Sequence, residues 1–425
     1  MKIGLLREWK KPADKRVALT PEQCVQFLNK FPEVDLVVEK SPDRTFPDKA
    51  YTKLGIAVAK DISDCDVLFG IKEVPIEKLI PNKTYCFFSH TIKAQAYNRD
   101  LLQAILKKNI TLIDYETLTW SEGGRILGFG KWAGIAGAYN AFLTWGKKTN
   151  QFSLPPAYET DDYEESIRLL SELNLHKTRI VFTGNGRVAA GIREVLEQMK
   201  LKECSPQEFV SQPPRNGYFT QLTIWDLYHR KDGGPWDIQH FYENHEDYCC
   251  EFDNFLSHAD ILINGMYWED SMPPLFNVQD TKQSNFAIKV IADITCDVEG
   301  SVPITMEATN IYNPTFGWSK SEQKQVAPFG EDTIDIMAVT NLPTELPKNA
   351  SEEFGTLLLK YVLPLVVNGD KSSILKRATI TSCISWRFSY RHLVYCNFPC
   401  CMHHYSRIQD GRAFFTSIIE NAVAI

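Results

Sequence analysis

The feature that most constrains the fold of this chain is a glycine turn at residues 184–189, which read Gly-Asn-Gly-Arg-Val-Ala. The turn follows an apolar run, 180–183, and opens an amphipathic stretch, 188–199. In the pattern G-x-G-x-x-G/A, the first glycine (Gly184) permits a tight turn and the second (Gly186) lets the backbone approach a pyrophosphate. A phosphate there meets the free N–H groups at the start of a helix. Any glycine turn can imitate this pattern, but its place between a strand and a helix favours a dinucleotide site.

Short apolar runs alternate with amphipathic stretches along much of the chain. Helices are predicted over 21–30, where Thr20 and Pro21 supply an N-cap and a first-turn proline, and over 99–108. A helix rich in small residues, 131–144, could pack tightly between domains. This alternation predicts parallel α/β sheets. Buried strands are predicted at 3–6, 36–38, 67–69, 85–88, 110–113, 261–264 and 289–294.

Composition excludes several classes of protein. The 46 Lys and Arg residues against 53 Asp and Glu residues give a net charge of −7, which argues against nucleic-acid binding. The most apolar stretch, 357–367, is broken by Lys360 and Pro364 and is too short to span a membrane. The first residues lack the apolar core of a signal peptide, and the eleven cysteines are scattered. We therefore expect a cytoplasmic protein with reduced thiols.

Two residue types suited to proton transfer follow predicted strands. Lys72, with Glu73 beside it, comes after the strand at 67–69, and His90 comes after the strand at 85–88. Ligands of open α/β sheets bind at the carboxyl ends of strands, where these side chains can meet. A lysine near other cations can have its pKa tuned for proton transfer. Alternatively, Lys72 is a solvated loop cation and His90 a capping residue.

Two arginines and two aspartates have equally open interpretations. Arg16 and Arg125 either hold substrate carboxylates through paired N–H bonds or form surface ion pairs. Asp293 and Asp297, at the end of a predicted strand, are either site residues or turn formers.

The residue that would discriminate NAD from NADP is uncertain. An acidic residue is expected about 20 positions beyond the glycine turn, where it would bind the ribose hydroxyls. Glu203 stands one residue early, and Ser205 would tolerate a 2′-phosphate. Both cofactors therefore remain open.

Histidine and cysteine form two groups that resemble metal sites. One contains His240, His245, Cys249 and Cys250, and the other lies at 396–404. Neither has paired C-x-x-C spacing or a matching half-site, so we expect no metal.

Several short motifs together resemble the alanine dehydrogenase, transhydrogenase and saccharopine dehydrogenase superfamily. Arg7-Glu8-x-Lys10, the segment 15–21 (Lys-Arg-Val-Ala-Leu-Thr-Pro) and the segment 71–75 (Ile-Lys-Glu-Val-Pro) are similar to the superfamily as a whole. The saccharopine branch is indicated by the segments 88–95, 113–116, 124–137, 262–268 and 292–297. The resemblance covers about residues 1–380, and the spaced set is more specific than any single motif.

This resemblance implies an α/β fold of two Rossmann-like domains with parallel sheets and a cleft between them. The catalytic, substrate-binding domain would comprise 1–128 plus about 331–380, and the dinucleotide-binding Rossmann domain 129–330. The implied residue roles are as follows: proton transfer by Lys72 and His90; carboxylate binding by Arg16, Gln95 and Arg125; support by Glu73 and Glu116; and NAD or NADP binding by Phe129, Gly184, Gly186, Arg187 and Asp297.

The implied activity is that of an NAD(P)-dependent saccharopine dehydrogenase, which cleaves saccharopine to L-lysine and 2-oxoglutarate or runs in reverse. Lysine–2-oxoglutarate reductase is an alternative, because the segment 212–256 resembles the reductase half of bifunctional lysine-degrading enzymes. An alanine dehydrogenase-like enzyme and a non-catalytic nucleotide-binding protein are further alternatives. The partner is expected to be a small-molecule substrate, and the sequence does not distinguish a monomer from a homo-oligomer.

The segment 381–425 departs from this pattern. It contains no lysine but four of the eleven cysteines, and its hydrophobic periodicity is poor before Phe414. We interpret it as an anomalous tail that arises from a shifted reading frame or a replaced exon, with a genuine lineage-specific tail as the alternative.

Overall fold

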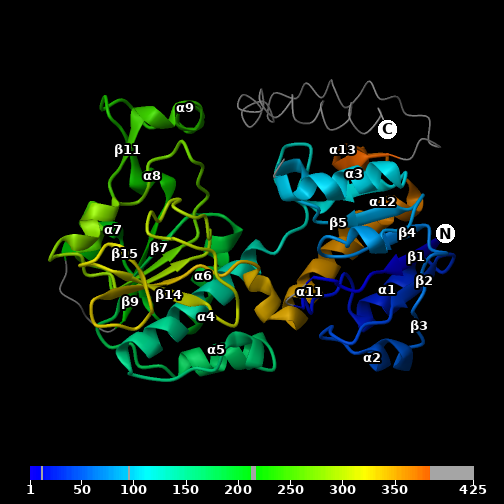
Figure 1. Ribbon diagram of the computed structural model, residues 1–425, viewed down its shortest axis with the longest axis horizontal. Helices are drawn as coiled ribbons and strands as arrows, with labels where there is room; N and C mark the ends of the chain where they lie inside the picture. Colours follow the sequence, from blue (N-terminus) through cyan, green and yellow to red (C-terminus); the bar gives the residue numbers. More distant parts are fainter. Residues whose placement is uncertain (11–12, 94–95, 212–216, 383–425) are drawn as a thin grey trace. The chain divides into compact units, whose positions relative to one another are not determined.

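The computed structural model describes residues 1–10, 13–93, 96–211 and 217–382. The chain forms two compact units, which Figure 1 colours along the sequence. Unit 1 comprises Met1–Gly128 and the chain from Pro347 onward, and unit 2 comprises Phe129–Leu346. Both units contain mostly parallel sheets with helices, which confirms the predicted α/β fold class.

Unit 1 contains a seven-stranded sheet in the order β17-β6-β5-β4-β1-β2-β3. All pairs are parallel except β17 with β6. The strands are β1 (Lys2–Leu5), β2 (Asp35–Glu39), β3 (Ala57–Ala59), β4 (Val67–Phe69), β5 (Thr84–Phe87), β6 (Thr111–Asp114) and β17 (Thr379–Thr381). The helices are α1 (Pro21–Lys30), α2 (Asp48–Lys53), α3 (Arg99–Lys107), α11 (Pro347–Leu357), α12 (Leu363–Asn368) and α13 (Ile374–Ala378).

Local signals explain why α1 begins where it does. Thr20 accepts a hydrogen bond from the Gln23 backbone, and the Gln23 side chain accepts one from the Thr20 backbone, so both ends of a capping box are present. Pro21 occupies the first turn, where a missing N–H costs nothing. The helix then buries Cys24 and Phe27 against the sheet. The predicted helix over 21–30 is observed with the same bounds.

Unit 2 contains an eight-stranded sheet in the order β15-β14-β16-β13-β12-β7-β9-β8. Its strands are parallel from β16 to β8, and β14 and β15 are antiparallel additions. The strands are β7 (Arg179–Thr183), β8 (Lys202–Glu203), β9 (Tyr218–Leu222), β12 (Ile261–Asn264), β13 (Val290–Asp293), β14 (Thr315–Ser319), β15 (Lys324–Val326) and β16 (Thr333–Met337). The helices are α4 (Gly130–Thr149), α5 (Tyr163–Ser171), α6 (Arg187–Gln198), α7 (Pro206–Ser211), α8 (Ile224–Leu227), α9 (Ile238–Glu243) and α10 (Asp253–Leu256).

The small residues of α4 serve a helix crossing within unit 2. A β-carbon on Gly134 would lie 2.0 Å from the Val188 carbonyl oxygen, and one on Gly191 would lie 2.0 Å from the Lys131 carbonyl oxygen. Glycine at both positions therefore lets α4 and α6 touch through their backbones, side by side in Figure 1. Packing of this helix between domains stays a prediction.

Two predicted boundaries differ from the structure. The return to the first domain was expected at about residue 331, but β16 pairs in parallel with β13 and belongs to unit 2. The tail was expected to begin at residue 381, but Thr381 ends β17, and its hydroxyl donates to the Ile110 carbonyl at 2.8 Å. The rest of the predicted tail, 383–425, lies outside the described residues.

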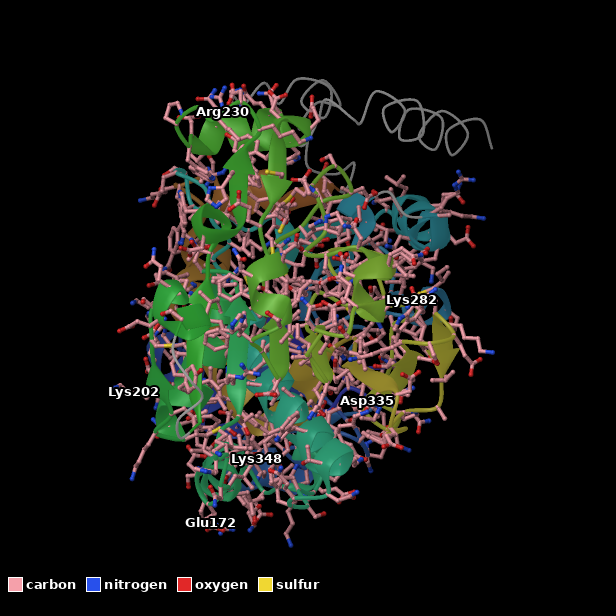
Figure 2. All side chains as sticks on the ribbon, turned by 90° about the vertical axis from the view of Figure 1, so that its left-hand side faces the viewer. Glu172, Lys202, Arg230, Lys282, Asp335 and Lys348 are labelled. Atoms are coloured by element: carbon pink, nitrogen blue, oxygen red, sulfur yellow. The ribbon has the colours of Figure 1, made fainter. Side chains whose placement is uncertain are left out.

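The aromatic segment after β9 forms a small excursion from the sheet. A hairpin of β10 (Tyr228–Arg230) and β11 (Tyr248–Cys250) packs around Phe241, whose ring contacts Tyr228, Trp236 and Tyr248. The hairpin projects beyond the sheet, so that Arg230 lies at the opposite end of unit 2 from Glu172 (Figures 1 and 2).

Candidate active site

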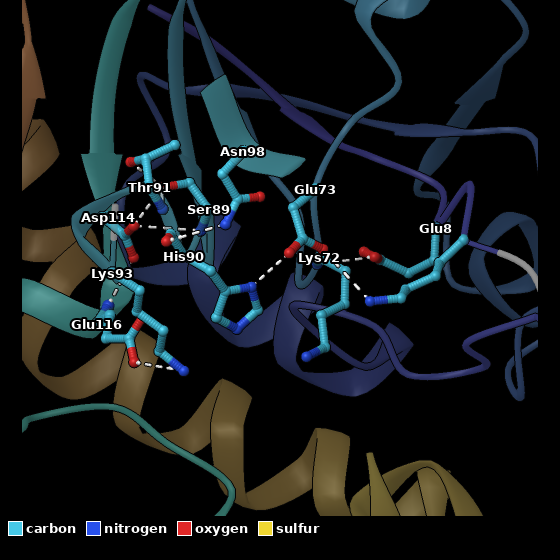
Figure 3. A network of polar contacts seen from close by, with 11 residues as sticks. Glu8, Lys72, Glu73, Ser89, His90, Thr91, Lys93, Asn98, Asp114 and Glu116 are labelled. Atoms are coloured by element: carbon cyan, nitrogen blue, oxygen red, sulfur yellow. Dashed lines mark hydrogen bonds and ion pairs between the residues drawn. The ribbon is translucent and has the colours of Figure 1, made fainter. Parts of the chain in front are cut away.

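The candidate proton-transfer residues lie at the carboxyl ends of neighbouring strands in the unit 1 sheet. Lys72 and Glu73 follow β4, His90 follows β5 and Glu116 follows β6, and these strands are neighbours in the sheet. Because neighbouring parallel strands have their carboxyl ends on the same side of the sheet, residues far apart in sequence converge there. Figure 3 shows Glu73 between Lys72 and His90.

Glu73 forms a hydrogen bond with His90. Its Oε1 contacts the His90 Nδ1, and Lys10 Nζ lies 3.7 Å from Oε2. Burial raises the pKa of Glu73, but the His90 hydrogen bond and charge, with Lys10, outweigh burial and lower it to about 2. Glu73 is therefore ionised throughout the neutral range and fixes one ring nitrogen of His90.

Lys72 has a strongly perturbed amine. Burial and then the positive charges of Arg16 and Lys10 lower the pKa of Lys72 from 10.5 to about 8, although Glu73 and Asp14 oppose the shift. A lysine with this pKa is partly neutral near physiological pH and can accept a proton. This property distinguishes Lys72 from the solvated loop cation that was its alternative interpretation.

Arg16 is buried against a carboxylate of its own chain. Its Nε donates to Asp14 Oδ1 at 2.9 Å, and its Nη2 donates to Oδ2 at 2.5 Å, with both side chains almost fully buried. Arg16 is thus not a surface ion pair. Asp14 occupies one edge of the guanidinium and fixes its plane.

Arg125, the second arginine predicted to bind a carboxylate, contacts Glu116. Arg125 Nη2 donates to Glu116 Oε1 at 3.0 Å, and Lys93 Nζ lies 3.7 Å from the same oxygen. The Glu116 side chain is only 7% exposed, whereas that of Arg125 is 47% exposed. The second oxygen, Oε2, is buried without a hydrogen bond to any described residue. Gln95, the third predicted carboxylate ligand, lies outside the described residues.

The His90 backbone is held in an unusual conformation. Its φ is 54°, a left-handed value that non-glycine residues seldom adopt. Asn98 Nδ2 donates to the His90 carbonyl at 3.1 Å, and the preceding Ser89 hydroxyl donates to the buried Asp114 carboxylate. Hydrogen bonds from Asn98 and to Asp114 therefore hold the His90 backbone in a strained conformation at a candidate active site.

The glycine turn of unit 2 has the geometry expected for a dinucleotide cradle. Gly184 has φ 99°, and a β-carbon there would lie 2.8 Å from the Gly265 carbonyl oxygen. A β-carbon on Gly186 would find no heavy atom within 4 Å, and no side chain caps the start of α6. These residues therefore leave room for a pyrophosphate at the helix N-terminus.

Other predicted cofactor residues surround this turn. Arg187 is the first residue of α6, and Phe129 directly precedes α4. A β-carbon on Gly130 would lie 3.1 Å from that of Arg187, so the start of α4 lies against the turn.

The two aspartates beyond β13 have different environments. Asp293 is fully buried, and it accepts hydrogen bonds from Asn264, Thr295 and Thr305 at 2.6–2.9 Å. This network favours the structural interpretation of Asp293. Asp297 lies four residues further on, in the turn that Gly300 closes by donating its N–H to the Asp297 carbonyl at 3.1 Å.

The topology identifies an acidic residue that sequence spacing missed. The strand next to β7 is β9, while β8 lies at the sheet edge, and Glu203 there is engaged by Arg193 at 2.7 Å on both oxygens. Asp226 stands just beyond β9, and its Oδ2 accepts from the Thr223 N–H at 2.8 Å and hydroxyl at 2.6 Å. Counting about 20 residues from Gly184 reaches β8 at the sheet edge, because β8 and α7 precede β9, the strand that neighbours β7.

The described residues lack two kinds of feature. They contain no group of three or more His, Cys, Asp and Glu side chains that could hold a metal, and the group at 396–404 lies outside them. No helix among them has the length and hydropathy needed to cross a membrane.

Comparison with known proteins gives consistent relationships. Residues 4–136 match the family model of the alanine dehydrogenase/PNT N-terminal domain. The chain is 32% identical to α-aminoadipic semialdehyde synthase of Arabidopsis thaliana, over 91% of this chain and 40% of that protein. It is 27% identical to saccharopine dehydrogenase [NAD(+), L-lysine-forming] of Yarrowia lipolytica, over 85% of this chain and 91% of that protein. A solved L-alanine dehydrogenase shares the fold, with a TM-score of 0.60 and 17% identity over 90% of this chain and 96% of that one.

The match to the alanine dehydrogenase/PNT N-terminal model includes the motifs at 7–21 and 71–75, and the solved L-alanine dehydrogenase supports the fold. Over most of its length the chain is similar to saccharopine dehydrogenases and to part of the α-aminoadipic semialdehyde synthases. The chain spans less than half the length of the semialdehyde synthases that it matches.

Proposed function

We propose that this chain is an NAD-linked saccharopine dehydrogenase that cleaves saccharopine oxidatively to L-lysine and 2-oxoglutarate. The observation that carries the proposal is the proton-transfer set of unit 1, in which Lys72 has a pKa of about 8 and Glu73 orients His90. The named activity of the Yarrowia lipolytica relative, which this chain covers almost fully, supports the same conclusion.

The chemistry separates into oxidation and hydrolysis. Neutral Lys72 removes the proton of the secondary amine, and the adjacent substrate carbon loses a hydride to give an imine. When bound, the nicotinamide accepts that hydride. His90 then takes a proton from the attacking water, and collapse of the C–N bond releases lysine and the keto acid. One saccharopine, one water and one oxidised nicotinamide are consumed, and one reduced nicotinamide and one proton are produced.

Substrate binding would depend on the cationic residues of unit 1. Arg16 and Arg125 are proposed to hold the carboxylates, because guanidinium groups bind carboxylates through paired N–H bonds, and Gln95 is proposed to donate its amide N–H to them. Asp14 fixes the plane of Arg16 in advance through two hydrogen bonds, and Glu116 accepts one hydrogen bond from Arg125. Such preorganisation reduces the entropy lost on binding.

We propose NAD as the cofactor because of Asp226. Its carboxylate, held by Thr223, stands beyond the strand adjacent to the glycine turn. A carboxylate in that position accepts the ribose hydroxyls of NAD and repels the 2′-phosphate of NADP. The pyrophosphate would lie at Gly184, Gly186 and Arg187, with Phe129 and Asp297 alongside the cofactor.

A second candidate is lysine–2-oxoglutarate reductase, the same chemistry run toward saccharopine. The higher identity to the semialdehyde synthase than to the saccharopine dehydrogenase favours it.

The cytoplasmic location stays a prediction, and the Bos taurus semialdehyde synthase is named as mitochondrial.

A panel of substrates and cofactors tests the proposal. Saccharopine, lysine with 2-oxoglutarate, and alanine are each assayed with NAD and NADP in the matching redox state. We expect turnover of saccharopine with NAD, and Lys72→Met should reduce it about 10²–10⁴-fold while cofactor affinity stays unchanged. Turnover only toward saccharopine would favour the reductase. Cofactor binding without turnover of any substrate would refute the proposal and favour a non-catalytic nucleotide-binding protein.

A further inference from the structure

A carboxylate that no part of the proposed chemistry uses holds the turn that carries Lys72. Glu8 Oε1 accepts a hydrogen bond from the Ile71 N–H at 2.7 Å, and Oε2 accepts one from the Lys72 N–H at 2.9 Å. Figure 3 shows Glu8 joined to Lys72 on the side away from His90. A single side chain thus satisfies two successive backbone donors.

The Glu8 contact lies just beyond the last backbone hydrogen bond between the β1 and β4 segments. The last backbone hydrogen bond between the β1 and β4 segments runs from the Leu6 N–H to the Phe69 carbonyl at 2.8 Å. On the other side of the turn, the Phe88 N–H donates to the Ile71 carbonyl at 3.0 Å. The β5 segment therefore holds the turn through its backbone, whereas the β1 segment holds it through the Glu8 side chain.

The position of the turn determines the position of both proton-transfer groups. Lys72 projects from it directly, and the next residue, Glu73, contacts the His90 ring. A side chain that accepts hydrogen bonds from two successive amides restrains both translation and rotation of the peptide between them, which a single hydrogen bond does not. Displacement of such a turn by about 1 Å would misalign Lys72 and His90 together.

We propose that Glu8 is a positioning residue for proton transfer, which acts by fixing the Ile71–Lys72 peptide through both side-chain oxygens. The inference rests on the proposed function, because it assigns Lys72 and His90 the proton-transfer roles. Glu8 touches neither substrate nor cofactor in this scheme.

Glu8→Gln is the variant that tests the proposal. It keeps the shape of the side chain, but its amide NH₂ faces one of the two backbone donors and cannot accept a hydrogen bond. Glu39→Gln is a matched control, because buried Glu39 accepts the Arg7 N–H at 2.9 Å within the same segment, away from the Lys72 turn. If Glu8→Gln fails to fold, Glu8→Asp is measured instead, since it keeps both oxygens but withdraws them by one methylene.

We expect Glu8→Gln to lower kcat by about 10- to 100-fold, with KM for saccharopine and Kd for NAD changed less than about threefold. The solvent deuterium isotope effect on kcat should rise because proton transfer becomes more rate-limiting. Glu39→Gln should change neither quantity. A merely structural role would lower the denaturation midpoint without changing the isotope effect, and that result would overturn the proposal.

Amide hydrogen exchange separates this inference from the proposed function. The Ile71 and Lys72 amides should exchange at least about tenfold faster in Glu8→Gln than in wild type or Glu39→Gln. If wild type turns over no substrate but exchange accelerates, the proposed function fails while the role of Glu8 in holding the turn stands. Unchanged exchange with wild-type kcat in folded Glu8→Gln would refute the positioning role.

Discussion

Replacing Lys72 by methionine should stabilise the protein while it removes activity. Burial, followed by the charges of Arg16 and Lys10, lowers the pKa of Lys72 from 10.5 to about 8. At about 1.36 kcal/mol per pKa unit, the charged form costs the folded state about 3 kcal/mol at most. Lys72 is partly exposed, so solvent screening reduces this cost, and we expect about 1–2 kcal/mol. Methionine retains most of the apolar stem and carries no charge.

The pH dependence of this gain in stability follows from the direction of the Lys72 pKa shift. Below pH 8 Lys72 is charged in both the folded and the unfolded state, so the folded state bears the full cost. Between pH 8 and 10.5 the folded state is neutral while the unfolded state is still charged, and the cost declines as pH rises. Lys72→Met should therefore unfold at a higher denaturant concentration than wild type at pH 7, with less than half of that gain at pH 9.5.

Guanidinium unfolding at both pH values measures this difference, with Lys60→Met as the control for an exposed lysine. Lower stability of Lys72→Met at pH 7 would refute the reasoning, as would a gain of equal size at both pH values. Either result would mean that Lys72 is well solvated or better paired than its surroundings indicate.

Three further predictions concern unit 2. Gly186→Val should abolish NAD binding in a calorimetric titration without changing the free energy of unfolding. A β-carbon at this position meets no protein atom but blocks a pyrophosphate. Normal binding would show that the glycine turn does not hold the cofactor. Asp226→Ser should weaken NAD about tenfold and improve NADP, measured as the ratio of the two Kd values; an unchanged ratio would remove Asp226 from the ribose site. Gly134→Ala should reduce the free energy of unfolding by about 2–3 kcal/mol, because its β-carbon would lie 2.0 Å from the Val188 carbonyl oxygen; wild-type stability would mean that α4 and α6 can separate at no cost.

Local signals in the sequence predicted much of the fold. The strands β1, β4, β5 and β6 and the helix α1 lie within a residue or two of their predicted bounds. Their signals are short-range: an apolar run for a buried parallel strand, and the Thr20-Pro21 pair for the helix start. The same signals placed Lys72 and His90 at strand ends, and neighbouring strands then brought them together.

Long-range pairing explains what the sequence did not predict. The ribose acid was sought near Glu203 because spacing alone cannot reveal that β9 inserts between β7 and β8. Glu8 was read only as part of a motif, because its partners lie 63 and 64 residues away. The frame-shift interpretation of the tail concerns residues outside the described ranges and stays a prediction, which translation of the coding DNA around codon 380 in all frames would test.

The proposed roles are separable by experiment because the residues that carry them belong to different units. The groups assigned to proton transfer, Lys72, Glu73 and His90, all belong to unit 1, whereas the glycine turn and Asp226 belong to unit 2. The hydrogen bonds that join Lys72 to Glu8 and Glu73 to His90 lie within unit 1, so Lys72→Met should leave NAD affinity intact and Gly186→Val should leave the Lys72 amine perturbed. Measuring the pKa of Lys72 by pH-dependent acylation in Gly186→Val examines this directly. A value that returned toward 10.5 would show that the two sets of residues are energetically coupled, and single substitutions could then no longer assign a role to either.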